Sequence, residues 1–545
     1  MTGDTRERVR AALEAHLAER DSAPFDALPE ADALVARFDF AADPDPAVDA
    51  YWVNEPYAHV TLRRDPETEE LAYDVLEPTR SEFVAYVHDD LRDVARRVLL
   101  DEAFAHDETG REAFAARLDE VIAEHAPSLP PADRWVVRYY LRRDFLGYGR
   151  IDPFMDDPAV EDVSCDGADV PVYVYHRDHG HLESNRAWGG DVVESLAVRL
   201  AQRAGRHVSA ANPLLTTTLP DGSRVQVTLG GDVATRGSNF TVRKFREEPF
   251  TPPELVSLRT FDARQMAYLW LAVAHNRSVL FVGPTGSGKT TSMNASAFFV
   301  PPDHKVVSIE ETREVNLPHE NWIADVTRTA DDASARAERT VDSYRLLSEA
   351  LHQRPDHIIV GELRTDPAVV RSFFQAVGTG HDGFTTFHAE SSDDAIRRLT
   401  HDPLSVPPDL LADLDVIVVQ RIVDEPDGVA RRCWQISEVE PLDGAERPQL
   451  RDVFRYDADT QSFVQNDAAR VPRDVAEDRG WGDERLRREL DRRQRMLAAL
   501  ADREVFDYES VAERVFTFER NPERALEDVP EDVLAGHDRV RVVDG

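Results

Sequence analysis

The spacing of hydrophobic and polar positions changes along the chain and predicts its order of elements. Residues 51–65 and 70–78 alternate apolar and polar positions, as half-buried strands do. Residues 111–125 and 133–149 instead place apolar side chains at helical spacing. Short strands are expected to follow at 170–177, 223–229 and 239–245. The first 245 residues are therefore predicted to mix helices with short strands.

Further along the chain, the pattern becomes that of a buried parallel sheet. Five segments are rich in Val and Ile and are separated by helical stretches, namely 278–283, 305–310, 357–363, 383–388 and 415–423. Strands that are covered on both faces by crossover helices have this composition. A charged helix with periodic apolar residues is predicted at 483–506. The fold class that follows is α/β.

These patterns divide the 545 residues into five predicted parts, and a chain of this length has room for two to four domains. Residues 246–255 contain three prolines and no periodicity, which favours a linker. The parts are an N-terminal α+β extension at 1–100, a helical segment with a small α+β domain at 101–245, a linker at 246–262, the parallel-sheet domain at 263–469 and a helical appendage at 470–545.

The charge balance is strongly acidic. The chain has 64 basic and 103 acidic residues, for a net charge of −39. Only Lys244, Lys289 and Lys305 are lysines, so arginine supplies the other 61 cations. Because the acid is spread over the whole chain, we interpret it as an adaptation to a salt-rich cytoplasm, where ions screen the repulsion between carboxylates. The same balance argues against non-specific binding of nucleic acid.

Two further features favour a cytoplasmic protein. Cys165 and Cys433 lie far apart without a C-x-x-C pairing, which fits a reducing compartment and excludes a four-cysteine zinc site. The N-terminus is charged from residue 4 onward and has no signal-peptide core, and no apolar run approaches the roughly 20 residues of a spanning helix. Any role at a membrane is therefore expected to depend on a partner.

A phosphate-binding loop is the clearest chemical motif. Residues 283–290 match G-x-x-x-x-G-K-[ST] between a predicted strand and a predicted helix, and a random match has a chance of about one in a thousand. Glycines let backbone N–H groups converge on a β-phosphate, Lys289 would bind β/γ oxygens, and the Thr290 hydroxyl would bind Mg²⁺. The candidate nucleotide-binding residues are Gly283, Pro284, Thr285, Gly286, Ser287, Gly288, Lys289, Thr290 and Thr291.

Acidic residues follow two of the predicted strands. Glu310, Glu311 and Glu314 lie where segment 305–310 leaves the sheet, and Glu362 lies near the end of segment 357–363. Nucleotide sites in such sheets lie at the carboxyl ends of the strands. Glu362 is therefore a candidate Walker B carboxylate, which holds Mg²⁺ or positions the attacking water. For the group at 310–314, a solvated acidic loop is the alternative.

Two histidines, His381 and His388, lie seven residues apart in GTGHDGFTTFHAES. No third ligand is spaced nearby, so they are not expected to bind a metal. A neutral imidazole can form a hydrogen bond to a phosphate or to the attacking water, which makes both residues candidate γ-phosphate sensors. The alternative is an ordinary loop histidine and a buried histidine at a strand end.

The order of phosphate loop, acidic box, Walker B strand and histidine box resembles the ATPases of type II and type IV secretion and filament assembly, over roughly residues 135–440. The matching segments are GYGRIDPFMDDPAVEDVSCDG, LPDGSRV, QRPDHIIVGELR and FFQAVGTGHDGFTTFHAES. GYGRID, EDVSCDG and YVYHR are most similar to the archaeal branch. The resemblance implies a RecA-like motor domain, a preceding PAS-like domain and a homohexamer in which a neighbouring subunit closes each ATP site.

The resemblance also implies an activity and partners. Hydrolysis of ATP with Mg²⁺ would power assembly of a type IV pilus-like filament or an archaellum, through a polytopic membrane platform protein. Arg224 or Arg243 would reach the nucleotide of the neighbouring subunit; the alternative is that these two and Lys244 are surface cations that balance nearby acids. The acidic box departs from the usual Glu-Asp-x-x-Glu, because Glu311 stands in the place of the aspartate. The zinc-binding cysteine pairs of some bacterial members are absent, so no zinc is expected.

Two other functions compete with this interpretation. A RecA-like nucleic-acid translocase or helicase would need a basic channel, and the lysine-poor segment EETREVNLPHE gives it little support. A non-hydrolysing scaffold that binds nucleotide as a switch would be favoured if Lys289 or Glu362 were missing, and both are present.

Overall fold

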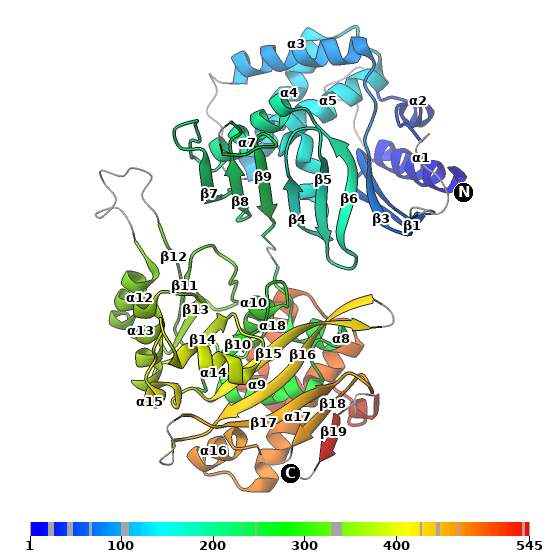
Figure 1. The fold of residues 1–545 in the computed structure, drawn as a ribbon. Coiled ribbons are helices and arrows are strands. Elements are labelled where there is room, and N and C mark those ends of the chain that lie inside the picture. Colours follow the sequence, from blue (N-terminus) through cyan, green and yellow to red (C-terminus); the bar gives the residue numbers. More distant parts are fainter. Residues whose placement is uncertain are drawn as a thin grey trace. The chain divides into compact units, whose positions relative to one another are not determined.

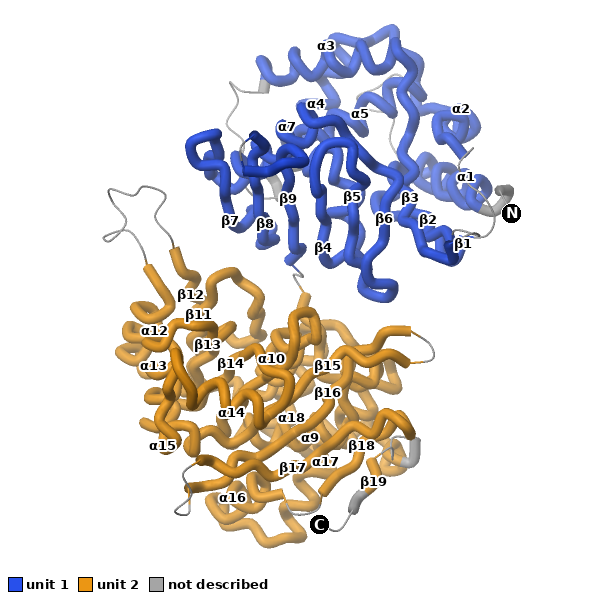
Figure 2. The backbone as a smooth tube through the Cα atoms, in the orientation of Figure 1, with its two compact units in different colours: residues 1–245 blue, residues 246–545 orange. Residues whose placement is uncertain are grey.

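The computed structural model describes residues 2–19, 27–40, 47–64, 68–99, 108–231, 233–245, 248–328, 341–425, 428–442, 447–466, 469–536 and 540–543. The chain forms two compact units, unit 1 at 1–245 and unit 2 at 246–545 (Figure 2). The division falls at the residue where the linker is predicted to begin. Among the described residues, no helix combines the length and the apolar character needed to cross a membrane.

Unit 1 contains a nine-stranded sheet in the order β1-β2-β3-β6-β5-β4-β9-β8-β7 (Figure 1). Its strands are β1 Ala47–Asn54, β2 Ala58–Arg64, β3 Leu71–Leu76, β4 Val160–Cys165, β5 Pro171–His176, β6 Gly180–Ala187, β7 Leu214–Thr218, β8 Arg224–Thr228 and β9 Asn239–Arg243. Its helices are α1 Thr2–Ala18, α2 Ala31–Val35, α3 Glu82–Leu99, α4 Glu108–His125, α5 Pro131–Phe145, η1 Gly149–Ile151, α6 Asp152–Asp156 and α7 Gly190–Arg203.

The strands of the predicted N-terminal extension belong to this same sheet. β3 pairs in parallel with β6, through Tyr73 and Ser184 among others. The hydroxyls of Tyr51 and Tyr73 donate to the buried carboxylate of Asp157, at 2.9 and 2.5 Å. Because β3 covers an edge of β6 and buries Tyr73 in the shared core, residues 1–100 and 101–245 do not form separate domains.

Unit 2 contains a ten-stranded sheet in the order β12-β11-β13-β14-β10-β15-β16-β17-β18-β19. Its strands are β10 Val279–Val282, β11 Val306–Glu310, β12 Trp322–Val326, β13 His357–Leu363, β14 Asp382–Phe387, β15 Val416–Glu425, β16 Gly428–Val439, β17 Leu450–Asp457, β18 Ser462–Asn466 and β19 Val540–Val543. Its helices are α8 Pro252–Ser257, α9 Ala263–Ala274, α10 Lys289–Ala297, α12 Ser343–His352, α13 Pro367–Gly378, α14 Ser392–Thr400, α15 Pro408–Leu411, α16 Val471–Asp478, α17 Asp483–Asp502, α18 Tyr508–Arg520, α19 Pro522–Ala525 and η2 Val533–Gly536.

The five apolar segments form the parallel part of the unit 2 sheet, together with β12. Each face of β10 is buried in a different core: Val279 and Phe281 lie in one cluster, and Leu280 and Val282 in the other. The first cluster includes residues of α9, α10, α17 and α18, and the second includes residues of α12, α13 and α14. Helices therefore cover both faces, and the predicted α/β class is confirmed.

Two predicted boundaries differ from the structure. Within the predicted linker, Pro252 and Pro253 occupy the first turn of α8, and Thr251 and Glu254 form a capping box. Proline is favoured in the first turn of a helix, so two of the three prolines begin an element instead of preventing one. Residues 470–545 are not an appendage, because α17 buries apolar side chains such as Leu497 against the core that contains α9.

Candidate functional site

The phosphate loop lies at the carboxyl edge of the parallel strands. β10 ends at Val282, and α10 begins at Lys289 directly after Gly288, whose φ is +91°. A Cβ on Gly283 would collide with the Gln420 carbonyl oxygen of β15, so only glycine fits there. The sheet and the helix therefore hold both ends of the loop, as the sequence motif predicts.

The donors of the loop suit phosphate oxygens. The carbonyl oxygen of Pro284 accepts from the Ser287 hydroxyl at 2.8 Å and from the Lys289 ammonium at 2.9 Å. Among the described residues, the backbone N–H groups of Thr285, Gly286 and Gly288 have no hydrogen-bond partner. Such N–H groups, next to an ammonium and a helix N-terminus, are what a nucleotide phosphate requires. The residues present therefore fit the predicted ATP.

His388 joins the phosphate loop to the Walker B strand. Its Nδ1 lies 3.4 Å from the Lys289 ammonium, and its Nε2 lies 2.8 Å from Oε1 of Glu362. An ammonium can only donate, so Nδ1 accepts and Nε2 carries the proton that is donated to Glu362. This pattern assigns a neutral imidazole with one tautomer, the form that the sensor role requires.

Arg364 links the Walker B carboxylate to the acidic box. Its Nε donates to Oε2 of Glu362 at 2.7 Å, and its second donor reaches Glu311 at 2.5 Å. Burial lowers the pKa of the Arg364 guanidinium, but the hydrogen bond to Glu362 and the charge of Glu311 outweigh it, so this pKa is raised overall. Both oxygens of Glu362 therefore accept from a protein donor, one from His388 and one from Arg364.

Glu310 differs from the other acidic residues because it is buried, with 4% of its surface exposed. Its Oε1 accepts from the backbone N–H groups of Glu314 and Val315, both at 2.9 Å. Burial raises its pKa to about 7, although these two bonds act in the opposite direction. Its Oε2 has no hydrogen-bond partner among the described residues. Glu310 thus anchors the turn on which Glu311 and Glu314 lie.

Oxygen ligands suitable for Mg²⁺ are present at this edge. Thr290 is half-buried, as is Thr291, on the first turn of α10, and the carboxylates of Glu310 and Glu362 belong to neighbouring strands. Mg²⁺ commonly takes one or two protein oxygens and completes its shell with water and phosphate. The described residues contain no group of three or more His, Cys, Asp or Glu arranged to hold a metal by themselves. Thr290 and Glu362 thus fit an ion shared with a nucleotide.

His381 does not join this cluster. It directly precedes β14, whereas His388 follows the last residue of that strand. Phe387 pairs with Val282, so the end of β14 lies beside the start of the phosphate loop. Because β14 and β10 are parallel, His381 lies at the opposite edge of the sheet, about six strand residues away. Its Nδ1 is buried without a hydrogen-bond partner among the described residues.

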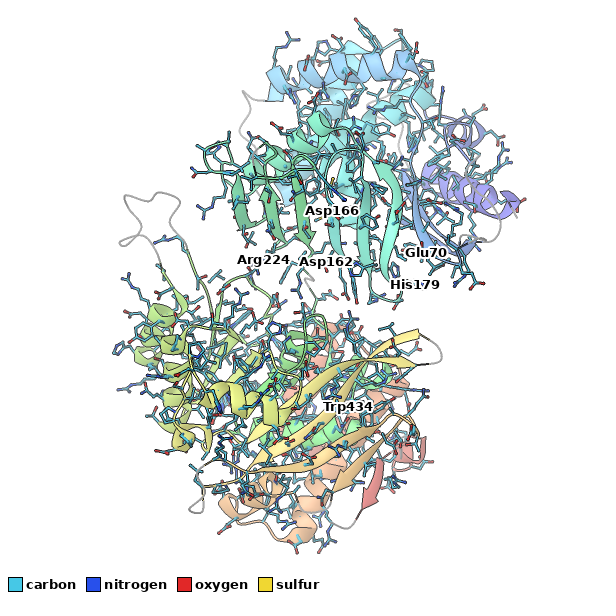
Figure 3. All side chains as sticks on the ribbon, viewed as in Figure 1. Glu70, Asp162, Asp166, His179, Arg224 and Trp434 are labelled. Carbon is cyan, nitrogen blue, oxygen red and sulfur yellow. The ribbon has the colours of Figure 1, made fainter. Side chains whose placement is uncertain are left out.

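The two candidate arginines belong to unit 1 and face each other. Arg224 of β8 pairs directly with Arg243 of β9, which in turn pairs with Asp162 of β4. Figure 3 shows Arg224 and Asp162 at the same end of the sheet. Like charges directly opposite each other on neighbouring strands are destabilising unless an anion lies between them. The neighbouring Lys244 turns inward instead, and its ammonium donates to the carbonyl oxygens of Phe154 and Asp157.

Several arginines at the site escaped the sequence interpretation. Arg364 could have been found, since it lies two residues after Glu362 in the same motif. Arg398 donates to the carbonyl oxygen of His388 at 2.7 Å, and Arg421 donates to that of Glu390 at 3.1 Å. Nothing local marks these two among 61 arginines, because their role depends on which loop the fold places beside them.

Comparison with known proteins assigns the family. Residues 161–477 match the family described as Type II/IV secretion system protein. The chain belongs to this family. Residues 4–79 match a second family, described as PilB3-like, N-terminal. The family predicted from the order of the motifs is confirmed.

Relatives of this secretion family cover different lengths of the chain. An uncharacterized protein of Methanocaldococcus jannaschii is 36% identical over 430 residues, which is 77% of this chain and 76% of the relative. Protein VirB11 of Agrobacterium fabrum is 28% identical over 273 residues, 45% of this chain and 77% of its own. The solved structure of the Yersinia pseudotuberculosis ATPase DotB is 17% identical, covers 66% of this chain and 89% of its own, and has a TM-score of 0.39.

Proposed function

We propose that this chain is a cytoplasmic ATPase that couples hydrolysis to the work of a type II/IV secretion or filament-assembly machine. The observation that supports this most strongly is the contact series from Lys289 through His388 to Glu362. It brings the phosphate loop, the histidine box and the Walker B strand to one edge of one sheet. Phosphoryl transfer to water requires a cation that binds the phosphates, here Lys289, and a carboxylate that positions the water, here Glu362.

We assign to Glu362 the activation of the attacking water, either directly as general base or through a bound ion. Each of its two oxygens accepts one hydrogen bond, from His388 and from Arg364, and has a second lone pair for the water or the ion; release of the His388 contact would free that imidazole. His388 would then present its Nε2–H to the γ-phosphate or to the water. Bound Mg²⁺ would neutralise charge on the β- and γ-oxygens, with Thr290 among its ligands. Glu311 and Glu314 would act on the same water or ion from the acidic box.

We further propose that the working form is a homohexamer and that unit 1 completes the site of a neighbouring subunit. The directly paired Arg224 and Arg243 support this, since two arginines placed side by side suit an anionic ligand. Reaching the γ-phosphate of the neighbour, they would stabilise charge that develops there, as arginine fingers do. The expected partner is a polytopic membrane protein that receives the motion and extracts filament subunits. The sequence favours an archaeal, halophilic source and a pilus or archaellum as the machine.

Lys289→Ala and Glu362→Gln test the assignment together. Lys289→Ala should abolish ATP turnover and weaken nucleotide binding, because the loop loses its ammonium. Glu362→Gln should keep ATP bound while turnover falls by at least about 100-fold, because an amide cannot accept a proton from water. Release of phosphate and equilibrium binding of ATP measure the two effects separately. Turnover near the wild-type rate in Lys289→Ala would disprove the proposed site.

A further inference from the structure

Arg431 contacts the phosphate loop from a strand outside the parallel part of the unit 2 sheet. Its Nε donates to the carbonyl oxygen of Gly286 at 2.9 Å, across 145 residues of sequence. A Cβ on Gly288 would lie 3.6 Å from the Cδ of Arg431, so the side chain also passes close to that glycine. Arg431 belongs to β16, which pairs antiparallel with β15. One arginine thus contacts the stretch of the loop between its two inner glycines.

The contact determines which way one peptide group faces. The Gly286 carbonyl and the Ser287 N–H belong to the same peptide, and in a trans peptide they point in opposite directions. Arg431 binds the carbonyl from outside the loop. The Ser287 N–H is directed inward, where it lies 3.4 Å from the Pro284 oxygen that Lys289 also contacts.

This peptide needs such support because glycine flanks Ser287 on both sides. Gly286 and Gly288 have φ values of +74° and +91°, in the region that glycine tolerates and other residues avoid. Glycine also leaves the backbone free to adopt other conformations at little cost. If the peptide turned over, the loop would lose one inward donor and would present a carbonyl oxygen to the phosphates, which repel it.

We propose that Arg431 is a positioning residue of the nucleotide site, which holds the Gly286–Ser287 peptide in the orientation that binds phosphate. The inference rests on the proposed function, because it requires that the loop binds nucleotide. Arg431 acts through the loop and not on the γ-phosphate. Loss of the Arg431 side chain therefore weakens the binding of ADP and ATP alike, and it leaves turnover at saturating ATP close to that of the wild type.

The chain offers two matched controls. Arg432, the next residue of β16, pairs with the carboxylate of Glu425 at 2.7 and 2.9 Å and donates to the carbonyl oxygen of Leu258. Replacing it by Gln should lower the melting temperature without changing nucleotide affinity. Arg455 of β17 is exposed, with 64% of its side chain accessible. Arg455→Ala removes the same charge from the same sheet without touching the loop.

The experiment compares Arg431→Ala, Arg431→Lys and both controls in the full chain. Calorimetric titration measures ADP binding directly and ATP binding in a Glu362→Gln background. Arg431→Ala loses one hydrogen bond from a charged donor, which should weaken the binding of both nucleotides about tenfold. The melting temperature should not change, and kcat should stay within about threefold. Arg431→Lys should recover part of the affinity, because an ammonium can still donate to a carbonyl.

Four results would overturn the inference. They are wild-type ADP affinity in Arg431→Ala, equal weakening in Arg455→Ala, weakening of ATP but not of ADP, and a fall in melting temperature like that of Arg432→Gln. Wild-type ADP affinity would leave Arg431 no role in binding, and equal weakening in Arg455→Ala would point to net charge. Weakening of ATP binding alone would point to direct contact with the γ-phosphate. A fall in melting temperature like that of Arg432→Gln would point to a structural role. If the wild-type chain itself bound neither nucleotide, the proposed function would fail instead.

Discussion

At the scale of single residues, the three lysines share one kind of contact. Lys289 donates to the carbonyl oxygen of Pro284, Lys305 to that of Gln353, and Lys244 to those of Phe154 and Asp157. An ammonium is a compact point charge, whereas a guanidinium is a planar fork suited to carboxylates. In a chain with 61 arginines, each of the three lysines thus places a compact cation on a backbone carbonyl oxygen.

Glu310 allows a prediction about pH at the same scale. Its pKa in the folded chain is raised to about 7 by burial, so its contribution to stability is present below about pH 4.5 and is lost as pH rises through 7. Glu310→Gln keeps an oxygen for the N–H groups of Glu314 and Val315 but carries no charge. The melting temperature of Glu310→Gln minus that of the wild type should therefore rise by roughly 2 to 5 °C when the pH is raised from 5 to 8.5.

Melting curves of the wild type and of Glu310→Gln at the two pH values measure this difference. The contributions of the other titrating groups to stability cancel in the comparison. A difference that stayed constant with pH would show that Glu310 is already ionised in the folded chain at pH 5.

At the scale of elements, helix α8 shows how a segment predicted to be a linker is ordered within unit 2. Thr251 is buried, caps α8 together with Glu254, and also donates to the carbonyl oxygen of Phe506 at 3.3 Å. Leu255 and Val256 then bury in the core of unit 2. The capping box and these two side chains attach the predicted linker to unit 2.

Thr251→Ala should lower stability by about 1 kcal/mol, because a lost cap leaves a helix N–H group without a partner. For a unit of this size, that is a fall in melting temperature of about 2 °C. Thr251→Ser keeps the hydroxyl and serves as the control. Equal melting of the Ala and Ser variants would mean that the cap contributes no stability.

At the scale of the whole molecule, net charge is the dominant property. At −39 the folded chain repels itself unless ions screen its carboxylates. The Debye length is about 10 Å at 0.1 M salt and about 3 Å at 1 M. Molar KCl should therefore raise the melting temperature and favour the oligomer, as scanning calorimetry and sedimentation can show. Equal stability in dilute buffer would contradict the halophilic interpretation.

The proposed hexamer leads to a mixing experiment. Arg243→Ala should lose hydrolysis and keep ATP affinity within a few-fold, because the phosphate loop of unit 2 is intact. Mixing it with Lys289→Ala subunits should restore some turnover, since some interfaces then combine an intact loop from one chain with an intact arginine from the other. The matched mixture with Arg224→Ala tests the second arginine. If confirmed hexamers showed no recovery at any ratio, Arg243 would not act in trans.

Much of unit 2 was predictable because local patterns encode local structure. Continuous Val and Ile runs between helical stretches predicted the parallel strands, and the phosphate loop was recognisable from eight residues. The strand β16 was missed, since GVARRCWQISEV mixes charged and apolar positions without strict alternation. The sequence predicts a separate N-terminal extension, because local patterns carry no sign of the edge pairing of β3 with β6, which joins residues more than 100 positions apart.

The class of the fold, the family and the phosphate loop follow from the sequence alone, since each depends on neighbouring residues and their spacing. Which side chains meet at the phosphate loop depends on the tertiary structure. It placed His388 between Lys289 and Glu362, removed His381 to the opposite edge and brought Arg431 to the loop. The physical reason is that strand order and register determine which residues become neighbours, and these depend on packing across the whole sheet.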